Sequence, residues 1–185
     1  MPSLIAHLSM GLFLWFWFRR SMGTFWTSIP RGAWMLLGLF LFLSMIPDLD
    51  ALVGMITGDM GRFHNQQSHS LFIGAVVAIL FALIASRMIR EVSLRKWFFL
   101  TLGCYEIHIL MDYVCYGRGV RILWPVIPDR FPAPVEIFNG LHWSYGWWHP
   151  AHLTTIKEEL LFAIILLGIT AAGVWVGKQI SKNKR

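Results

Sequence analysis

Long apolar runs separated by short polar segments dominate the sequence. The runs cover about residues 4–18, 33–56, 71–89, 97–116 and 160–176. A helix needs about 20 mainly apolar residues to cross the hydrocarbon core of a bilayer, and most of these runs approach or exceed that length. The pattern therefore predicts an all-α fold, a polytopic membrane helical bundle with about five transmembrane helices.

The composition supports a membrane protein and excludes an ordinary water-soluble enzyme. Of the 185 residues, 56% are apolar and only 14% are charged, whereas soluble domains carry roughly 25% charged residues. The mean hydropathy is +0.58. The 10 Trp and 14 Phe suit a lipid-facing surface with interfacial belts. Five spans leave no room for a second domain of usual size, so residues 1–185 form a single integral membrane domain.

The positions of the basic residues predict the orientation. They cluster after the first, third and fifth runs, in three groups that alternate topology puts on one face: Arg19, Arg20 and Arg31; Arg87, Arg90, Arg95 and Lys96; Lys178, Lys182, Lys184 and Arg185. The positive-inside rule makes that face cytoplasmic, with the N-terminus outside and the C-terminus inside. We expect a multi-pass protein of the bacterial inner membrane, and we assign the net charge of +6 to topology and not to nucleic-acid binding.

The segment 118–152 is predicted to cap the bundle on the extracytoplasmic side. It is rich in Pro, Trp and His, and its His142, His149 and His152 are interpreted as interfacial residues more readily than as metal ligands.

Seven ionisable residues are expected to gather toward the extracytoplasmic side of the membrane. Ionisable groups inside a bilayer cost several kcal/mol each unless they pair, bind metal or line water. His108 and Asp112 are four residues apart and therefore share one helix face. The set is His7, Asp48, Asp50, His64, His69, His108 and Asp112.

Neutral imidazoles together with carboxylates favour a divalent metal, with zinc as the first choice and manganese or iron as alternatives. Seven groups exceed the needs of one ion, so the pattern indicates two ions, or one ion with a general acid or base. Two bland interpretations stay open. His7 alone could be a hydrogen-bonded packing histidine, and Asp48 with Asp50 could simply end a helix at the interface.

At these residues the sequence resembles the YdjM-like integral membrane proteins, described as LexA-regulated, membrane-bound metal-dependent hydrolases. The resemblance runs from the first span to about residue 125. Its motifs are the early His7, Pro47-Asp48-Leu49-Asp50, His64 followed after four residues by His69-Ser70, His108 followed after three residues by Asp112, and Leu123-Trp124-Pro125. The family is also distantly similar to zinc-dependent phospholipase C, which suggests phosphoester substrates by analogy.

One motif departs from the family pattern. The family usually has His-Arg-Gly-x-Thr-His-Ser, whereas this chain has Asn65-Gln66-Gln67-Ser68 between His64 and His69. The missing arginine could clamp a phosphate, and Arg62 or Arg118 are candidates to replace it.

The sequence and the resemblance together predict a membrane-embedded metal-dependent hydrolase. We expect His7, Asp48, His69, His108 and Asp112 to bind the metal. Asp50 and His64 are expected to be catalytic, as proton-transfer groups or further ligands. The expected reaction is cleavage of a phosphoester of a membrane lipid or lipid-linked substrate by metal-activated water.

The alternatives are a divalent-cation or proton-coupled transporter that uses the same His and Asp residues, and a haem protein with two axial histidines. The sequence indicates neither the substrate nor an oligomeric state.

Overall fold

The computed structural model describes residues 2–141 and 148–182, and within these ranges the regular structure is helical. Two isolated bridges, Cys115 with Phe138 and Val120 with Phe131, are its only β-type pairings in the described residues. The main helices are α1 (Leu4–Phe18), α3 (Gly32–Leu43), α4 (Leu49–Thr57), α6 (Leu71–Met88), α7 (Leu94–Tyr113) and α8 (Ala151–Lys182). Short elements connect them: η1 (Arg19–Met22), α2 (Phe25–Ser28), η2 (Ile46–Asp48), α5 (Met60–Phe63) and η3 (Gln67–His69). The predicted all-α fold is confirmed.

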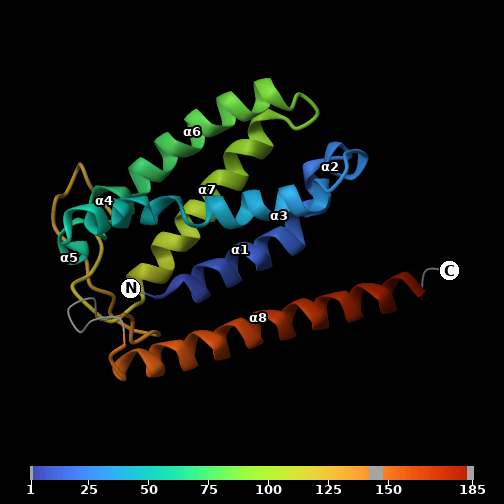
Figure 1. The fold of residues 1–185 in the computed structure, drawn as a ribbon. Helices are drawn as coiled ribbons and strands as arrows, with labels where there is room; N and C mark the ends of the chain where they lie inside the picture. Colours follow the sequence, from blue (N-terminus) through green and yellow to red (C-terminus); the bar gives the residue numbers. More distant parts are fainter. Residues whose placement is uncertain (1, 142–147, 183–185) are drawn as a thin grey trace.

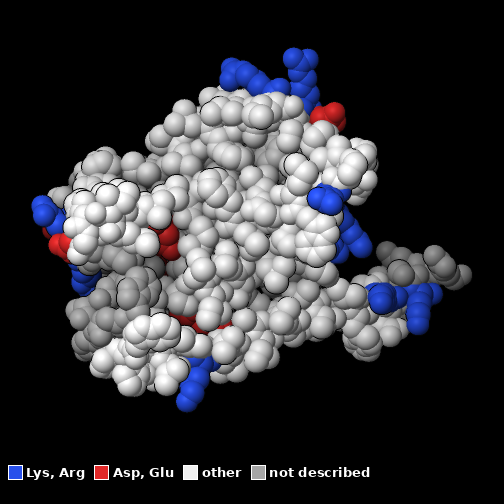
Figure 2. Space-filling model, viewed as in Figure 1, with Lys and Arg blue, Asp and Glu red and all other residues white. Residues whose placement is uncertain are grey.

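The main helices run up and down along one bundle (Figure 1). The end of α1, the α2 segment, the connection from α6 to α7 and the end of α8 lie toward one end, which we call the basic end. The start of α1, α4, α5, the end of α7 and the start of α8 lie toward the other, which we call the site end. On the face that Figure 2 shows, Lys and Arg lie at the extremities of the molecule, and the wide surface between them carries only a few acidic atoms. Such a surface suits burial in lipid.

Two helices in the described part of the chain are long and apolar enough to cross a membrane. They are Leu71–Met88 and Ala151–Ile180, and Gly32–Leu43 with Ile46–Thr57 makes a third if that bent pair counts as one span. Helix α1 has only 15 residues, and α7 carries ionisable side chains along its length, including Glu106 and Asp112. Length and composition thus support two to three spans, and the count of five remains a prediction.

The predicted continuous span 33–56 is broken in the structure. The axes of Gly32–Leu43 and Ile46–Thr57 differ by 54°, and Pro47 lies in the first turn of η2 at the break. Proline has no backbone N–H, so it cannot continue the helical ladder of α3. The bend lies at the site end. Asp48, the last residue of η2, and Asp50, in the first turn of α4, are therefore both placed there.

The last helix begins at Ala151, earlier than the predicted start at residue 160. One charged residue in this first part of the helix has several partners in the structure. Glu159 is fully buried, and its carboxylate accepts hydrogen bonds from the backbone and hydroxyl of Ser3 and from the Ala6 amide. These bonds satisfy free N–H groups in the first turn of α1. They attach α8 to the helix that carries His7, and the capping segment consequently ends at residue 150.

The basic end contains the larger apolar core. Buried Leu36 and Phe40 of α3, Ala82 of α6, and Trp97 and Leu100 of α7 belong to it. Burying a large apolar side chain contributes about 1.5–3 kcal/mol, so this core fixes the helices that reach the site.

A close contact between α6 and α7 depends on Gly74. A Cβ at this position would lie 2.5 Å from Glu106 Oε1 and 2.7 Å from Tyr105 Cδ1. The helices approach closely here, and the Tyr105 hydroxyl donates to the Ser68 carbonyl at 2.5 Å. The contact therefore sets the distance between His69, which precedes α6, and His108 on α7.

Gly74→Ala is expected to destabilise the protein by about 1–3 kcal/mol, because the new methyl group overpacks this contact. Gly103→Ala on α7 is the matched control, since a Cβ there meets nothing within 4 Å. Alanine should stabilise the helix at Gly103 by up to about 1 kcal/mol. Thermal unfolding midpoints in detergent should fall for the first variant and stay or rise for the second. Equal shifts would show that the two helices do not meet at Gly74.

Candidate metal centre

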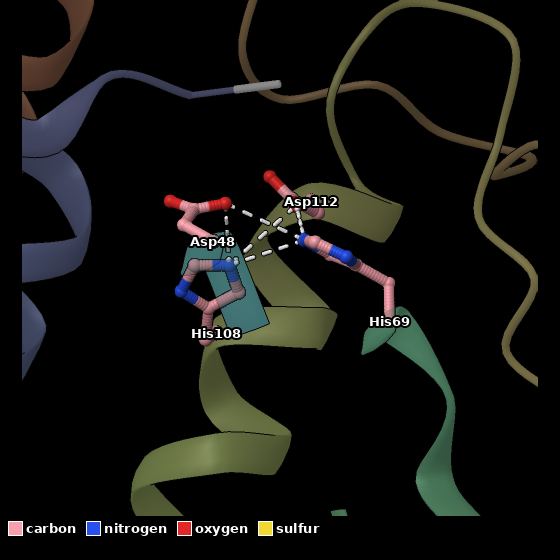
Figure 3. Close-up of side chains that lie close together, drawn as sticks. All are labelled: Asp48, His69, His108 and Asp112. Atoms are coloured by element: carbon pink, nitrogen blue, oxygen red, sulfur yellow. Dashed lines mark hydrogen bonds and ion pairs between the residues drawn. The ribbon is translucent and has the colours of Figure 1, made fainter. Parts of the chain in front are cut away.

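Four side chains from three segments meet at the site end, as Figure 3 shows. Asp48 is the last residue of η2, and His69 is the last residue of η3. His108 and Asp112 lie one turn apart on α7. The side chains of His69, His108 and Asp112 are fully buried, and that of Asp48 is 11% exposed. The sequence predicted the convergence of these four residues.

Five of the six separations between the four ligand atoms are known, and four of them are close to the edge of a zinc-centred tetrahedron. Asp48 Oδ1 lies 3.5 Å from His69 Nε2 and 3.3 Å from His108 Nε2. Asp112 Oδ2 lies 2.8 and 3.6 Å from the same two nitrogens, which are 3.4 Å from each other. With zinc–ligand bonds of about 2.0–2.1 Å, adjacent ligands of a tetrahedral site are about 3.3–3.4 Å apart. The group therefore has the dimensions of a site for one divalent ion.

A backbone carbonyl sets the tautomer of His108. Its Nδ1 lies 2.7 Å from the Ser44 carbonyl oxygen, which can only accept a hydrogen bond. Nδ1 must therefore carry the proton, and in the neutral ring Nε2 points a lone pair into the group. A hydrogen bond from the remote ring nitrogen to a carbonyl is the usual support of a metal-binding histidine.

Ser68 sets the tautomer of His69 in the same way. The Ser68 hydroxyl donates to Asp50 Oδ2 at 2.6 Å, so its oxygen is left to accept from His69 Nδ1 at 3.0 Å. The neutral His69 ring then also directs its Nε2 lone pair at the group.

The group therefore consists of atoms that offer electron pairs, and no hydrogen-bond donor among them can neutralise those pairs. Asp48 Oδ1 and both carboxylate oxygens of Asp112 are buried and accept no hydrogen bond from the described residues. Two imidazole lone pairs point at them. Buried acceptors without donors are costly, and a bound cation satisfies all of them at once. The donor set, two imidazoles and two carboxylates, fits zinc, manganese or iron.

Asp50 and His64 form a second pair beside this group. Asp50 Oδ1 lies 2.9 Å from His64 Nδ1, and its Oδ2 accepts from Ser68 Oγ and from the Gln66 amide at 3.4 Å. His64 Nδ1 is also 3.6 Å from Asp48 Oδ1. Together with His69, the pair forms a second cluster whose ligand atoms are close enough for a metal. Because Asp50 already accepts from three donors, its carboxylate is better suited to orient His64 than to bind a metal.

His7 lies against the group but outside the four ligand atoms. Its buried ring stacks on His108, with centroids 3.7 Å apart and planes at 15°. Its Nε2 lies 3.5 Å from Asp112 Oδ1, the carboxylate oxygen that does not face His69. Neither ring nitrogen has a hydrogen-bond partner in the described residues. His7 as a direct ligand stays a prediction.

The comparison with protein families fits this arrangement of residues. The family model described as YdjM inner membrane protein matches residues 1–180 of this chain. The match includes every residue of the site. The chain belongs to the YdjM family. The inner membrane protein YbcI of Escherichia coli (strain K12) is 33% identical over 143 residues, which is 75% of this chain and 76% of that protein. No solved structure matches the chain.

The sequence analysis of this YdjM-family protein missed the residues that orient His69 and His108. The Ser44 carbonyl, the Ser68 hydroxyl and the Tyr105 hydroxyl support the two histidines directly or through Ser68. Ser70 caps the following helix by accepting from the Phe72 amide, whereas the Ser68 hydroxyl donates to Asp50. A backbone carbonyl leaves no trace in a sequence, so Ser44 could not have been found.

The structure describes two of the three histidines that were assigned to the capping segment. His142 lies outside the described residues. The rings of His149 and His152 are 6.2 Å apart, and neither belongs to a metal-capable group of the described residues. Their interfacial role remains a prediction.

Proposed function

We propose that this YdjM-family protein is a membrane-embedded, metal-dependent hydrolase that cleaves a phosphoester of a lipid or lipid-linked substrate. The observation that carries the proposal is the buried group of Asp48, His69, His108 and Asp112, whose two histidine lone pairs and unpartnered carboxylate oxygens face one another at ligand distances. Ionisable groups at membrane depth indicate function by default.

Asp48, His69, His108 and Asp112 would hold one divalent ion. When bound, such an ion lowers the pKa of a coordinated water and stabilises negative charge on a phosphoryl oxygen. Catalytic zinc usually has three protein ligands, so four ligands require five-coordinate zinc or a six-coordinate manganese or iron ion. Zinc remains the first choice.

Asp50 and His64 are proposed as the proton-transfer pair. Asp50 accepts the Nδ1 proton of His64 at 2.9 Å, which leaves Nε2 as the basic nitrogen of the ring. An aspartate that fixes the tautomer of a histidine base in this way is a recurrent catalytic arrangement. The side chain of Asp50 is 15% exposed, in contrast to the fully buried side chains of the deeper histidines.

A lipid is proposed as the substrate because of where the site opens. Asp48 and Asp50 are the partly exposed members of the group. Asp48 ends η2 and Asp50 lies in the first turn of α4, directly after the bend between α3 and α4. Exposed apolar side chains of α4, among them Leu52, Val53 and Ile56, surround that turn. A substrate with an apolar tail and a polar ester would satisfy both surfaces.

We expect the site end to face the extracytoplasmic side of the inner membrane. A reporter fused after Arg185 should be cytoplasmic, and one inserted near Asp129 should be extracytoplasmic, because the basic end is retained inside. Alkaline phosphatase and fluorescent-protein fusions measure this directly. Both reporters on one side would overturn the five-span topology.

The proposed activity is tested with full-length protein in lipid nanodiscs. Phosphate-ester lipids are offered as substrates with zinc, manganese or iron(II) added back after chelation. We expect hydrolysis that chelation abolishes and one metal restores, and no activity in Asp112→Ala. Absence of hydrolysis of any phosphorylated or esterified lipid under every metal would refute the hydrolase proposal.

A transporter is the weaker alternative, because the path beyond the site is apolar. Between the site and the basic end lie the buried side chains of Phe40, Leu43, Trp97 and Leu100. An ion pathway needs polar groups along its length. Metal uptake into proteoliposomes without hydrolysis would favour the transporter.

A further inference from the structure

Three arginines follow the end of α7 and lie close to the metal centre. Arg118, Arg121 and Arg130 belong to the segment between α7 and α8. The segment is attached to the start of α6 at the site, since Leu71 donates its amide to the Ile122 carbonyl at 3.1 Å and the Ser70 hydroxyl donates to the Trp124 carbonyl. The arginines are therefore held next to His69, which immediately precedes Ser70.

Arg118 contacts the site directly. Its Nη2 donates to the His64 carbonyl oxygen at 2.7 Å. The ring of His64 in turn contacts Asp50 and Asp48. Arg118 is exposed, and its guanidinium thus lies at the surface next to His64.

The backbone holds Arg130 close to Arg118. Val120 and Phe131 exchange two backbone hydrogen bonds of 3.2 and 2.9 Å, and Arg130 Nη1 donates to the Gly119 carbonyl at 2.9 Å. Gly119 has φ +76°, and a Cβ there would lie 2.6 Å from the Phe131 carbonyl carbon. Glycine is required for this close approach, because any side chain would separate the two segments.

Two of the three arginines lack a neighbouring acid in the part of the chain that the structure describes. Neither Arg121 nor Arg130 has a carboxylate within ion-pair distance in the described residues. The Arg121 Nε is buried and donates no hydrogen bond there. Burial, with the charges of Arg118 and Arg121, lowers the pKa of Arg130 to about 10. Arg121 and Arg130 are therefore partly buried cations close to a third cation, Arg118, and an anion would satisfy the unused donor of Arg121.

We propose that Arg118, Arg121 and Arg130 form an anion site that binds the phosphate group of the substrate beside the metal centre. The inference deepens the proposed hydrolase function and rests on it for the identity of the substrate. Planar guanidinium groups bind phosphate by paired, charge-assisted hydrogen bonds. In this chain the segment after α7 supplies the arginine that the motif between His64 and His69 lacks.

Inorganic phosphate binding to zinc-loaded, full-length protein in nanodiscs tests the proposal without requiring turnover. The variants are Arg121→Gln, Arg130→Gln and the charge-retaining Arg121→Lys. Arg62→Gln is the matched control, because Arg62 is a basic residue of the same end that contacts Phe63 and not the site. Zinc content is measured for every sample, so that metal-bound phosphate contributes equally.

We expect each Arg→Gln variant to raise the dissociation constant of phosphate about 10- to 100-fold, the scale of one charge-assisted hydrogen bond. Arg121→Lys should lose less, and Arg62→Gln should match the wild type. Equal phosphate affinity in Arg121→Gln, Arg130→Gln and the wild type at equal zinc content would overturn the anion site. A loss in Arg62→Gln alone would assign the clamp to Arg62 and overturn it as well.

Competition distinguishes the two sources of the phosphate. A phosphate-monoester lipid in the nanodisc and water-soluble glycerol phosphate are each titrated against bound phosphate. We expect both to compete through the arginines, the lipid at the lower concentration. Arginine-dependent phosphate binding without lipid hydrolysis would refute the hydrolase and support the anion site. Hydrolysis with an unchanged KM in the arginine variants would support the hydrolase and refute the anion site.

Discussion

Asp50→Asn is expected to lower phosphoester hydrolysis at least about 100-fold, the usual contribution of one acid–base group. The carboxylate of Asp50 accepts from His64 Nδ1, Ser68 Oγ and the Gln66 amide. An amide of similar volume cannot accept from all of these groups, and it can offer an N–H to His64 Nδ1. The ring would then adopt the other tautomer, and Nε2 would no longer be basic.

The same variant should keep most of its metal, because Asp50 is not among the four ligand atoms of the main group. Asp59→Asn is the matched control. Asp59 is an exposed acid after α4 whose Oδ1 accepts from the Arg62 amide, and its loss should leave both metal and rate unchanged. The measurements are metal per protein, kcat and KM. A wild-type rate for Asp50→Asn would show that this residue has a structural role only.

His108→Ala is expected to release the metal and abolish activity. The substitution removes one of four ligand atoms and the bond to the Ser44 carbonyl. Loss of an outer-shell partner alone typically lowers metal affinity 10- to 100-fold, and loss of a ligand should exceed that. Because metal binding joins η2, η3 and α7, zinc should raise the thermal midpoint of the wild type and not that of the variant.

The control for this experiment is His149→Ala. His149 is an exposed histidine of the capping segment and lies outside the metal-capable groups of the described residues. It should keep the metal content, the zinc-dependent stabilisation and the activity of the wild type. If His108→Ala retains full metal while His149→Ala loses it, the metal site is in the capping segment.

The sequence was sufficient to predict the central group of residues. The distribution of Lys and Arg fixed the relative directions of the helices, and helical spacing placed His108 and Asp112 on one face. Those two arguments alone brought Asp48, His69, His108 and Asp112 to the same end of the bundle. Local periodicity and charge could do this because each of these residues lies at or next to the end of a long helix.

The parts that failed depend on tertiary contacts. The start of the last helix at Ala151 was missed, because the partners that let Glu159 be buried, Ser3 and Ala6, lie far away in the sequence. The bend at Pro47 has an angle that no sequence pattern specifies. Arg121 and Arg130 lie in irregular backbone after α7, so sequence spacing says nothing about their proximity to Arg118 and the site.

The most direct test of the metal centre is X-ray absorption at the metal K edge of purified, metal-loaded protein. We expect a first shell of nitrogen and oxygen at about 2.0–2.2 Å, no sulfur, and outer-shell scattering from two imidazoles, with the metal signal largely lost in His108→Ala. A sulfur ligand, or an imidazole signal that His108→Ala and His69→Ala leave unchanged, would contradict this expectation.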